Sequence, residues 1–490
     1  MDRGQAQGGP LPRSAGRAGA GRLRLHRARP DRVAPVRRAR VLQRGRPSRL
    51  GPAALPRPAA ALRHGAAAAA PRTAARRAQR RGLRRAARLQ RRRPRADARR
   101  GGDLVAGGAD TPGALEGLRV VDLSQVWAGP LALKLLGDMG ADVIKVESGR
   151  RTDTARGDPN PQASSAIYPD DDPGDEPWNR AGLFNDRNRS KRGICLDLTM
   201  PEGIATLKRL IAASDVVAES YRFGVLERLG AGYEAIREVK PDIVYVSFSS
   251  QGATGPERSY GSYGAILEQT AGIASITGYR DGPPKTSGTF FPDPVVAMLG
   301  VGAILAAVRR RDRTGEGTFV DLSQREVATS IVPEMLMDYT MNGRVRGPQG
   351  NHHEVYAPQG VYPGAGEDTW VTITVRSDAE WRALAELIGG PELASDARFA
   401  TLLGRRRRHD ELDAQIAAWT REREPREVME QLQALGVAAG MVHRGDTLLE
   451  DPQLVERGFW EPVDHPAAGL IPHLSRPFKL SRTPGWPCLV

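Results

Sequence analysis

Alternation of apolar runs with helix-like segments across residues 118–322 constrains the fold of this chain more than any other feature. The runs are rich in Val, Ile and Leu and are predicted to be strands at 118–123, 142–147, 193–198, 215–219, 242–248 and 318–322. Predicted helices fall between or after them, at 130–139, 201–213, 224–239, 264–276, 295–308 and 324–341. Strands that alternate with helices form parallel sheets covered on both faces. We therefore predict an α/β protein with a doubly wound, Rossmann-like sheet.

The loop after the first predicted strand, residues 124–129, lacks the Gly-x-Gly-x-x-Gly pattern of dinucleotide-binding folds. A dinucleotide is therefore not the expected ligand. Ligands of open parallel sheets still bind beyond the carboxyl ends of the strands. Because Trp127 lies in this loop, we expect it to be near the ligand.

Changes in composition divide the rest of the chain. Residues 342–360 are rich in Gly, Pro, Asn and His and predict a linker into a smaller α+β unit. That unit has a predicted strand at 370–375, a helix at 378–388 and a charged helical stretch at 405–434, and from residue 436 the composition returns to that of the first domain. The predicted parts are an extension at 1–112, the large domain at 113–341, the linker and small domain at 342–435, and a return to the large domain at 436–490.

Residues 1–112 differ sharply from the remainder in charge. They hold thirty Arg, no Lys and five Asp, a net charge of +25, which leaves −10 for the rest of the formal +15. Without Phe, Tyr, Trp or Ile they cannot bury enough apolar surface to offset the entropy of ordering, so we predict disorder. The segment could be an arginine-rich nucleic-acid arm, an organelle transit peptide, or an upstream reading frame of GC-rich DNA. The missing residues have AT-rich codons, which favours the upstream frame, and a nucleic-acid partner is not expected.

Three further patterns bear on where the protein is located and what it binds: the cysteines on the compartment, the apolar runs on membrane association, and the histidines on a metal site. Cys195 and Cys488 form no metal or redox spacing, so a cytoplasmic location is expected. The apolar run at 295–308 suits a buried helix and is too short for a bilayer, so no membrane association is expected. His352-His353-Glu354 could suggest a metal site, but adjacent side chains diverge and no third ligand follows at helical spacing. We predict no metal.

Asp293 stands between Pro292 and Pro294, where a Gly-Pro-Pro turn leads into the apolar helical run. One interpretation is an N-cap, whose carboxylate accepts a hydrogen bond from a free amide of the helix. The other is a carboxylate kept ionised by the helix amides, which attacks an electrophile. Local sequence leaves both interpretations open. The chain has no Gly-x-Ser-x-Gly elbow and no phosphate-binding Walker loop that would indicate a different chemistry.

Several stretches occur in the order that they have in one known family. They are LEGLRVVDL at 115–123, AGP at 128–130, GADVIKVE at 140–147, SKRGICLDL at 190–198, PEG at 201–203, GPP at 282–284 running on to Asp293, and TGEG at 314–317. On these stretches the chain, from Leu115 to about Pro484, resembles the family III CoA-transferases, the group of formyl-CoA transferase and carnitine CoA-transferase.

The resemblance implies a large Rossmann-like domain built from both chain ends, a small inserted domain, and two chains interlocked as a homodimer. It places the family's nucleophile on Asp293, which would move coenzyme A from an acyl-CoA donor to a carboxylic acid through aspartyl anhydride and aspartyl-CoA thioester intermediates. Coenzyme A thioester is then a substrate, and no tightly bound cofactor is expected. The family's CoA-binding positions fall on Val126, Arg156, Leu196, Tyr221 and Arg228.

The chain also departs from the family pattern. Ser148, Thr199 and Ser220 stand where formyl-CoA transferase has Arg, Lys and Asn, so we expect Arg150 or Arg151 to contact the CoA phosphates. Trp127 replaces a glutamine beside the reacting acyl group. A larger and less polar acid than formate or oxalate is therefore expected as substrate.

Two alternative functions follow from other features. Racemases of α-methylacyl-CoA share the fold and the aspartate but add a histidine, and the matching position here is about Tyr263. A phenol is a poor acid–base partner near neutral pH, which disfavours racemisation. A nucleic-acid-binding protein, the second alternative, rests solely on residues 1–112.

Overall fold

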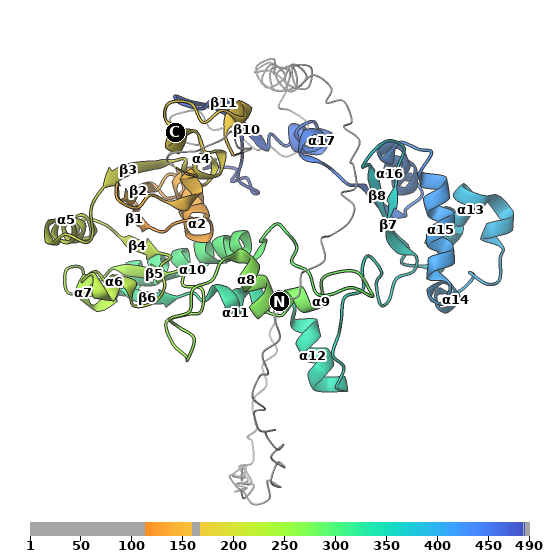
Figure 1. Ribbon diagram of the computed structural model, residues 1–490, viewed down its shortest axis with the longest axis horizontal. Helices are drawn as coiled ribbons and strands as arrows, with labels where there is room; N and C mark the ends of the chain where they lie inside the picture. Colours follow the sequence, from red (N-terminus) through yellow and green to blue (C-terminus); the bar gives the residue numbers. More distant parts are fainter. Residues whose placement is uncertain (1–112, 159–166, 484, 486–490) are drawn as a thin grey trace, which may run out of the picture. The chain divides into compact units, whose positions relative to one another are not determined.

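The computed structural model describes residues 113–158, 167–483 and 485 (Figure 1). The predicted disorder of residues 1–112 falls outside the described residues. So does Cys488.

A six-stranded parallel sheet forms within residues 119–321, as the sequence predicts. Its strands lie in the order β3-β2-β1-β4-β5-β6, and every neighbouring pair is parallel. The bounds are Arg119–Leu123 for β1, Asp142–Glu147 for β2, Lys191–Cys195 for β3, Val216–Glu219 for β4, Val244–Ser247 for β5 and Thr318–Asp321 for β6. The predicted third strand is therefore displaced: pairing begins at Lys191, and residues 196–198 continue as a loop.

Helices cover both faces of this sheet, which confirms the doubly wound prediction. On one face, α2 (Ala128–Asp138) and α10 (Pro292–Thr314) pack on a core that includes Val120 of β1. On the other, α5 (Pro201–Ala212), α6 (Val225–Arg228) and α7 (Tyr233–Arg237) pack on a core that includes Val121. Adjacent side chains of a strand point to opposite faces, so Val120 and Val121 each reach a separate core.

Three predicted helices are broken in the structure, each at residues that interrupt helical geometry. The segment 224–239 divides into α6 and α7 across Gly230, and 264–276 divides into α8 (Gly264–Thr270) and α9 (Ile273–Ile276) at Gly272. Both glycines have positive φ, of 76° and 91°, outside the right-handed helical region. The segment 324–341 divides into α11 (Gln324–Thr329) and α12 (Pro333–Asn342), where Pro333 begins a new helix.

Helix α10 is longer than the apolar run that predicted it. It has 23 residues, and by length and composition alone it could cross a membrane. Core helices of soluble proteins meet the same criteria, and α10 buries Val296, Ala297 and Ile304 in the sheet core.

Between β2 and β3 the chain forms short helical segments. These are the 3-10 helices η1 (Thr154–Arg156) and η2 (Pro169–Asp171), followed by α3 (Pro177–Arg180) and α4 (Gly182–Asn188). Residues 159–166 of this connection are outside the described residues. The last helix, α4, lies against α2 and carries Arg187.

The small domain has its own antiparallel sheet, ordered β7-β8-β9. Its elements are β7 (Gln359–Pro363), β8 (Trp370–Thr374), α13 (Asp378–Ala394), α14 (Leu402–Arg407), α15 (His409–Thr420), α16 (Pro425–Ala434) and β9 (Ala438–Met441). Strand β9 pairs with β8, so this sheet includes residues beyond 435. Gly436, at φ 77°, turns the chain from α16 into β9.

After β9 come α17 (Gly445–Leu449), α18 (Pro452–Glu456) and the hairpin β10 (Trp460–His465) and β11 (Gly469–Leu474). The hairpin contacts elements of the large sheet. Lys134 Nζ of α2 lies 3.5 Å from the Leu474 carbonyl oxygen, and Arg189 pairs with Glu461 at 3.4 Å.

Candidate active site

The order of the sheet places a ligand site between β1 and β4. The chain runs outward from β1 to β3 on one side and from β4 to β6 on the other, and such a reversal leaves a crevice beyond the strand ends. A cavity of about 700 Å³ lies there, lined by residues that follow β1, β2, β3 and β4 and by the start of α10. The volume is in the range of pockets for organic ligands.

Six of the predicted site residues line this cavity: Val126, Trp127, Leu196, Tyr221, Tyr263 and Asp293. They come from four loops and one helix that are far apart in sequence, and the sheet brings them together. Tyr263 precedes α8 and is 67% exposed.

Arg156 and Arg228 do not belong to the lining. Arg156 donates to both carboxylate oxygens of Glu147, at 2.8 and 2.7 Å, and its guanidinium carbon lies 3.5 Å from the centre of the Phe184 ring. Arg228 is an exposed residue at the end of α6. Their predicted contacts with coenzyme A stay predictions.

Other cationic groups do line the cavity, namely Arg150, Arg151 and Arg222. Arg150 pairs with Asp197 at 3.0 Å. Ser220 also lines the cavity, and its hydroxyl oxygen accepts a hydrogen bond of 2.8 Å from the Gln125 amide. Ser220 therefore holds the loop that follows β1.

Asp293 is not an N-cap, which corrects one of the two interpretations of its sequence. Helix α10 begins at Pro292, and the N-cap residue is Phe291, so Asp293 lies inside the first turn. The Ala128 amide, at the start of α2, lowers the pKa of the Asp293 carboxylate. This amide belongs to a different helix, 165 residues away in sequence.

Different groups around Asp293 have opposite effects on its pKa. Burial raises its pKa to about 6, and Glu268 adds to the rise, while Arg187 and the Ala128 hydrogen bond lower it. The side chain is therefore ionised at neutral pH but has few solvent contacts, since the residue is 9% exposed. A poorly solvated carboxylate facing a cavity is suited to nucleophilic attack.

Sequence reasoning missed two charged residues near Asp293. Glu268 is fully buried and accepts hydrogen bonds from the amide and hydroxyl of Ser287, at 2.7 and 2.6 Å, which ties α8 to the turn before α10. Arg187 is buried on α4, with its guanidinium carbon 3.9 Å from the centre of the Trp127 ring. Nothing in the polar run around Arg187 separates it from its neighbours before the chain folds.

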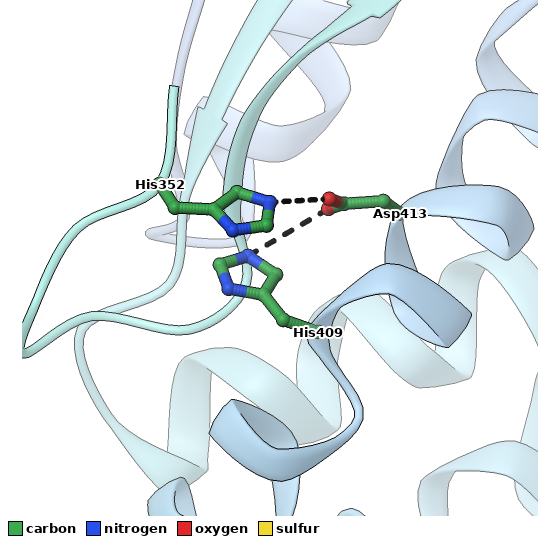
Figure 2. A group of neighbouring side chains, drawn as sticks. All are labelled: His352, His409 and Asp413. Carbon is green, nitrogen blue, oxygen red and sulfur yellow. Dashed lines mark hydrogen bonds and ion pairs between the residues drawn. The ribbon is translucent and has the colours of Figure 1, made fainter. Parts of the chain in front are cut away.

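A second group of candidate ligands lies in and beside the small domain. His352 of the linker meets His409 and Asp413 of α15, which stand one helical turn apart (Figure 2). In the sequence, His352 stands beside His353 and Glu354, neither of which belongs to this group. The i, i+4 spacing of His409 and Asp413 is the signal in the sequence that would have found the group.

The geometry of this group is that of a hydrogen-bonded network. His352 Nε2 donates to Asp413 at 2.7 Å, and Tyr362 donates its hydroxyl to the other carboxylate oxygen at 2.8 Å. His409 Nε2 accepts the Gln359 amide at 2.9 Å, which fixes it as an acceptor. Burial and the neighbouring His352 lower the pKa of His409, so its imidazole is neutral at pH 7.

The two imidazoles are poorly placed to share a metal ion. Their ring centres are 3.8 Å apart and their planes are within 9° of parallel. A metal binds the ring nitrogen about 2 Å away along the lone pair, which lies in the ring plane. An ion in the plane of one ring would be well out of the plane of the other, so chelation needs a ring to rotate.

A family model, similar proteins and a similar solved structure all relate this chain to the same family. Residues 115–488 match the model of "CoA-transferase family III". The chain is 34% identical over 374 residues to "Succinyl-CoA--D-citramalate CoA-transferase" of Chloroflexus aurantiacus, covering 76% of this chain and 89% of that protein. It is 33% identical over 370 residues to "Succinate--glutarate CoA-transferase" of Agrobacterium fabrum, covering 76% and 90%. Among solved structures, a CAIB/BAIF family protein from Brucella suis is similar, with a TM-score of 0.67 and 30% identity over 77% of this chain and 97% of that one.

Proposed function

This chain belongs to CoA-transferase family III and is a CoA-transferase, and from this premise we propose that Asp293 carries coenzyme A covalently between two carboxylic acids. The observation that carries the proposal is the Asp293 carboxylate itself. It lines the cavity at the strand ends, and it is ionised at neutral pH despite its burial.

In the proposed reaction an Asp293 oxygen attacks the thioester carbonyl of the donor acyl-CoA. The carbon–sulfur bond breaks, leaving an aspartyl–acyl anhydride and CoA thiolate. The thiolate attacks the aspartyl carbonyl, which forms aspartyl-CoA thioester and releases the donor acid as a carboxylate. The acceptor carboxylate then reverses these steps, leaving as its own CoA thioester and restoring the Asp293 carboxylate. No proton is gained or lost overall.

We propose a dicarboxylic acid of four or five carbons as one of the two acids. The support is that similar proteins are named for succinate, glutarate and citramalate, and that Trp127 and basic residues are at this cavity. Arg150, Arg151 and Arg222 are the proposed contacts of the CoA phosphates, since guanidinium groups bind phosphate in a bidentate manner.

A homodimer is the proposed assembly, supported by the apolar surface of α12. Four large apolar side chains of this ten-residue helix are 48–73% exposed, namely Leu336, Met337, Tyr339 and Met341. Soluble monomers seldom expose such a group together. Light scattering on the purified protein is expected to give the mass of two chains, and Met337→Glu should shift it toward one.

Chemical trapping tests the role of Asp293. The protein is incubated with succinyl-CoA and hydroxylamine, without an acceptor acid. Activated Asp293 should be converted to its hydroxamate, and peptide mapping by mass spectrometry should place the modification on that residue with concurrent loss of activity. Modification at a different carboxylate, or none in an active preparation, would refute covalent catalysis by Asp293. The control omits the acyl-CoA.

A further inference from the structure

Val126 has a backbone conformation that its side chain disfavours. Its φ is +72°, in the left-handed region, where a β-branched residue is rare and strained. Such a conformation persists only where surrounding contacts impose it. Val126 lies one residue before Trp127 and two before Ala128, and all three line the cavity together with Asp293, whose pKa the Ala128 amide lowers.

Two buried charged side chains form hydrogen bonds with the backbone of Val126, one at its amide and one at its carbonyl oxygen. The Val126 amide donates to both carboxylate oxygens of Asp153, at 3.1 and 3.2 Å. Its carbonyl oxygen accepts a hydrogen bond of 3.1 Å from Arg187 Nη1. Asp153 is 1% and Arg187 7% exposed, so both contacts are shielded from water.

Asp153 and Arg187, which contact Val126, each make further contacts with neighbouring residues. Lys145 Nζ lies 3.4 Å from Asp153, and the same ammonium donates to the Ser124 carbonyl oxygen at 2.8 Å. The central carbon of the Arg187 guanidinium lies over the Trp127 ring, 3.9 Å from the ring centre. The guanidinium therefore makes a hydrogen bond to Val126 and a cation–π contact with Trp127.

We propose that Asp153 and Arg187 are positioning residues that hold Val126 in its left-handed conformation, and that this conformation directs the Ala128 amide at the reacting carboxylate. The proposal rests on the proposed role of Asp293. A relaxed Val126 would turn the peptide planes that follow it and move the Ala128 amide away from Asp293. Arg187 also lowers the pKa of Asp293, so the test must separate a charge effect from a positioning effect.

A double-mutant cycle between Arg187 and Val126 separates the charge effect from the positioning effect. Arg187→Met keeps apolar contact with Trp127 but removes the donor and the charge. Val126→Gly removes the strain, because glycine adopts positive φ without a steric penalty. If Arg187 acts by holding Val126, the substitution at Arg187 should lower kcat by about 30-fold in the wild type and less than about 5-fold in the Val126→Gly protein. Equal losses in the two backgrounds would overturn the proposal.

The pH profile and a second variant give independent readouts. At pH 9 the Asp293 carboxylate is ionised whether or not Arg187 lowers its pKa, so an effect exerted through that pKa would vanish there, whereas a positioning loss should persist in kcat. Arg187→Lys keeps the charge but has no planar group to lie on Trp127, and it should also lower kcat with little change in KM. Wild-type kcat in Arg187→Lys, or full recovery of Arg187→Met at pH 9, would refute positioning.

Failure of this inference is distinguishable from failure of the proposed function. If hydroxylamine trapping labels Asp293 but the cycle shows no coupling, only the positioning role is lost. If Asp293 is not labelled, the covalent mechanism fails irrespective of Arg187. Circular dichroism and thermal melting of each variant show whether it is folded before kinetics are compared.

Discussion

In two parts of this protein an aspartate lies among charged and polar groups. The two carboxylates differ in how much of their hydrogen-bonding capacity is already used. At the strand ends, the Asp293 carboxylate lines a cavity of about 700 Å³, and Arg187 and the Ala128 amide lower its pKa. In the small domain, both oxygens of Asp413 accept hydrogen bonds, from His352 and from Tyr362. A carboxylate whose oxygens are already bound contributes to folding, whereas one that faces a cavity retains capacity for chemistry.

The two parts also differ in how protonation affects them. Burial raises the pKa of Asp293 to about 6, so the folded protein binds its proton more tightly than the unfolded chain. Stability from this group is fully present below pH 4 and is lost as pH rises through 6. The pKa of His409 is lowered, so its contribution has the opposite sign and is lost as pH falls below its unfolded value of 6.5.

The largest expected effect is that of Asp293→Asn. Transfer should fall by at least about a thousandfold, because the amide is not a nucleophile. At pH 8 the variant should be more stable than the wild type, by up to about 3 kcal/mol, because it removes a buried charge. The gain should shrink below pH 6 and be absent near pH 4. Calorimetric melts across this range measure it, and a pH-independent difference would contradict the raised pKa.

Gly264→Ala should displace the Asp293 carboxylate through a steric clash. A Cβ at Gly264 would lie 2.6 Å from an Asp293 carboxylate oxygen and 2.5 Å from the Phe290 Cβ. The displaced carboxylate should lower kcat by about 10- to 100-fold. The matched control is Gly302→Ala, at an exposed position of α10 where a Cβ has no neighbour within 4 Å. Wild-type kinetics in Gly264→Ala would mean that Asp293 tolerates movement.

Asp413→Ala tests the other side of the comparison. It leaves the buried Tyr362 hydroxyl without its acceptor, so the free energy of unfolding should fall by about 1–3 kcal/mol. Turnover per folded molecule should change less than about threefold, since no described atom of this cluster lines the cavity at the strand ends. Zinc added to the wild type should leave its melting temperature unchanged. A zinc-dependent rise that Asp413→Ala abolishes would show that the rings rotate and chelate.

The smallest expected effect concerns His409. Protonation of His409 Nε2 removes the acceptor of the Gln359 amide, so hydrogen-exchange protection of β7 and α15 should fall as the pH drops below 6.5, the ordinary pKa of histidine. His409→Gln keeps an acceptor without titrating, and its protection should be insensitive to this pH change. Equal pH dependence in both proteins would assign the titration to another group.

Sequence patterns predicted the large sheet because each strand and helix carries its own apolar periodicity. Val120 and Val121 show the alternation that places neighbours on opposite faces, and both reach separate cores. Breaks inside helices were less predictable. Gly230 and Gly272 were assigned to helix interiors, where glycine is tolerated, and only their positive φ in the fold reveals the interruptions.

The sequence by itself determined the alternating α/β order and, through its resemblance, the family, and it singled out Asp293 as the candidate nucleophile. Only the tertiary structure decided which groups surround that aspartate. The Ala128 amide lowers its pKa from a position 165 residues away in sequence, and Arg187 donates to the Val126 carbonyl oxygen across 61 residues. Apolar periodicity is written locally, in steps of two or 3.6 residues, whereas the partner of a buried polar group depends on which loops the sheet brings together.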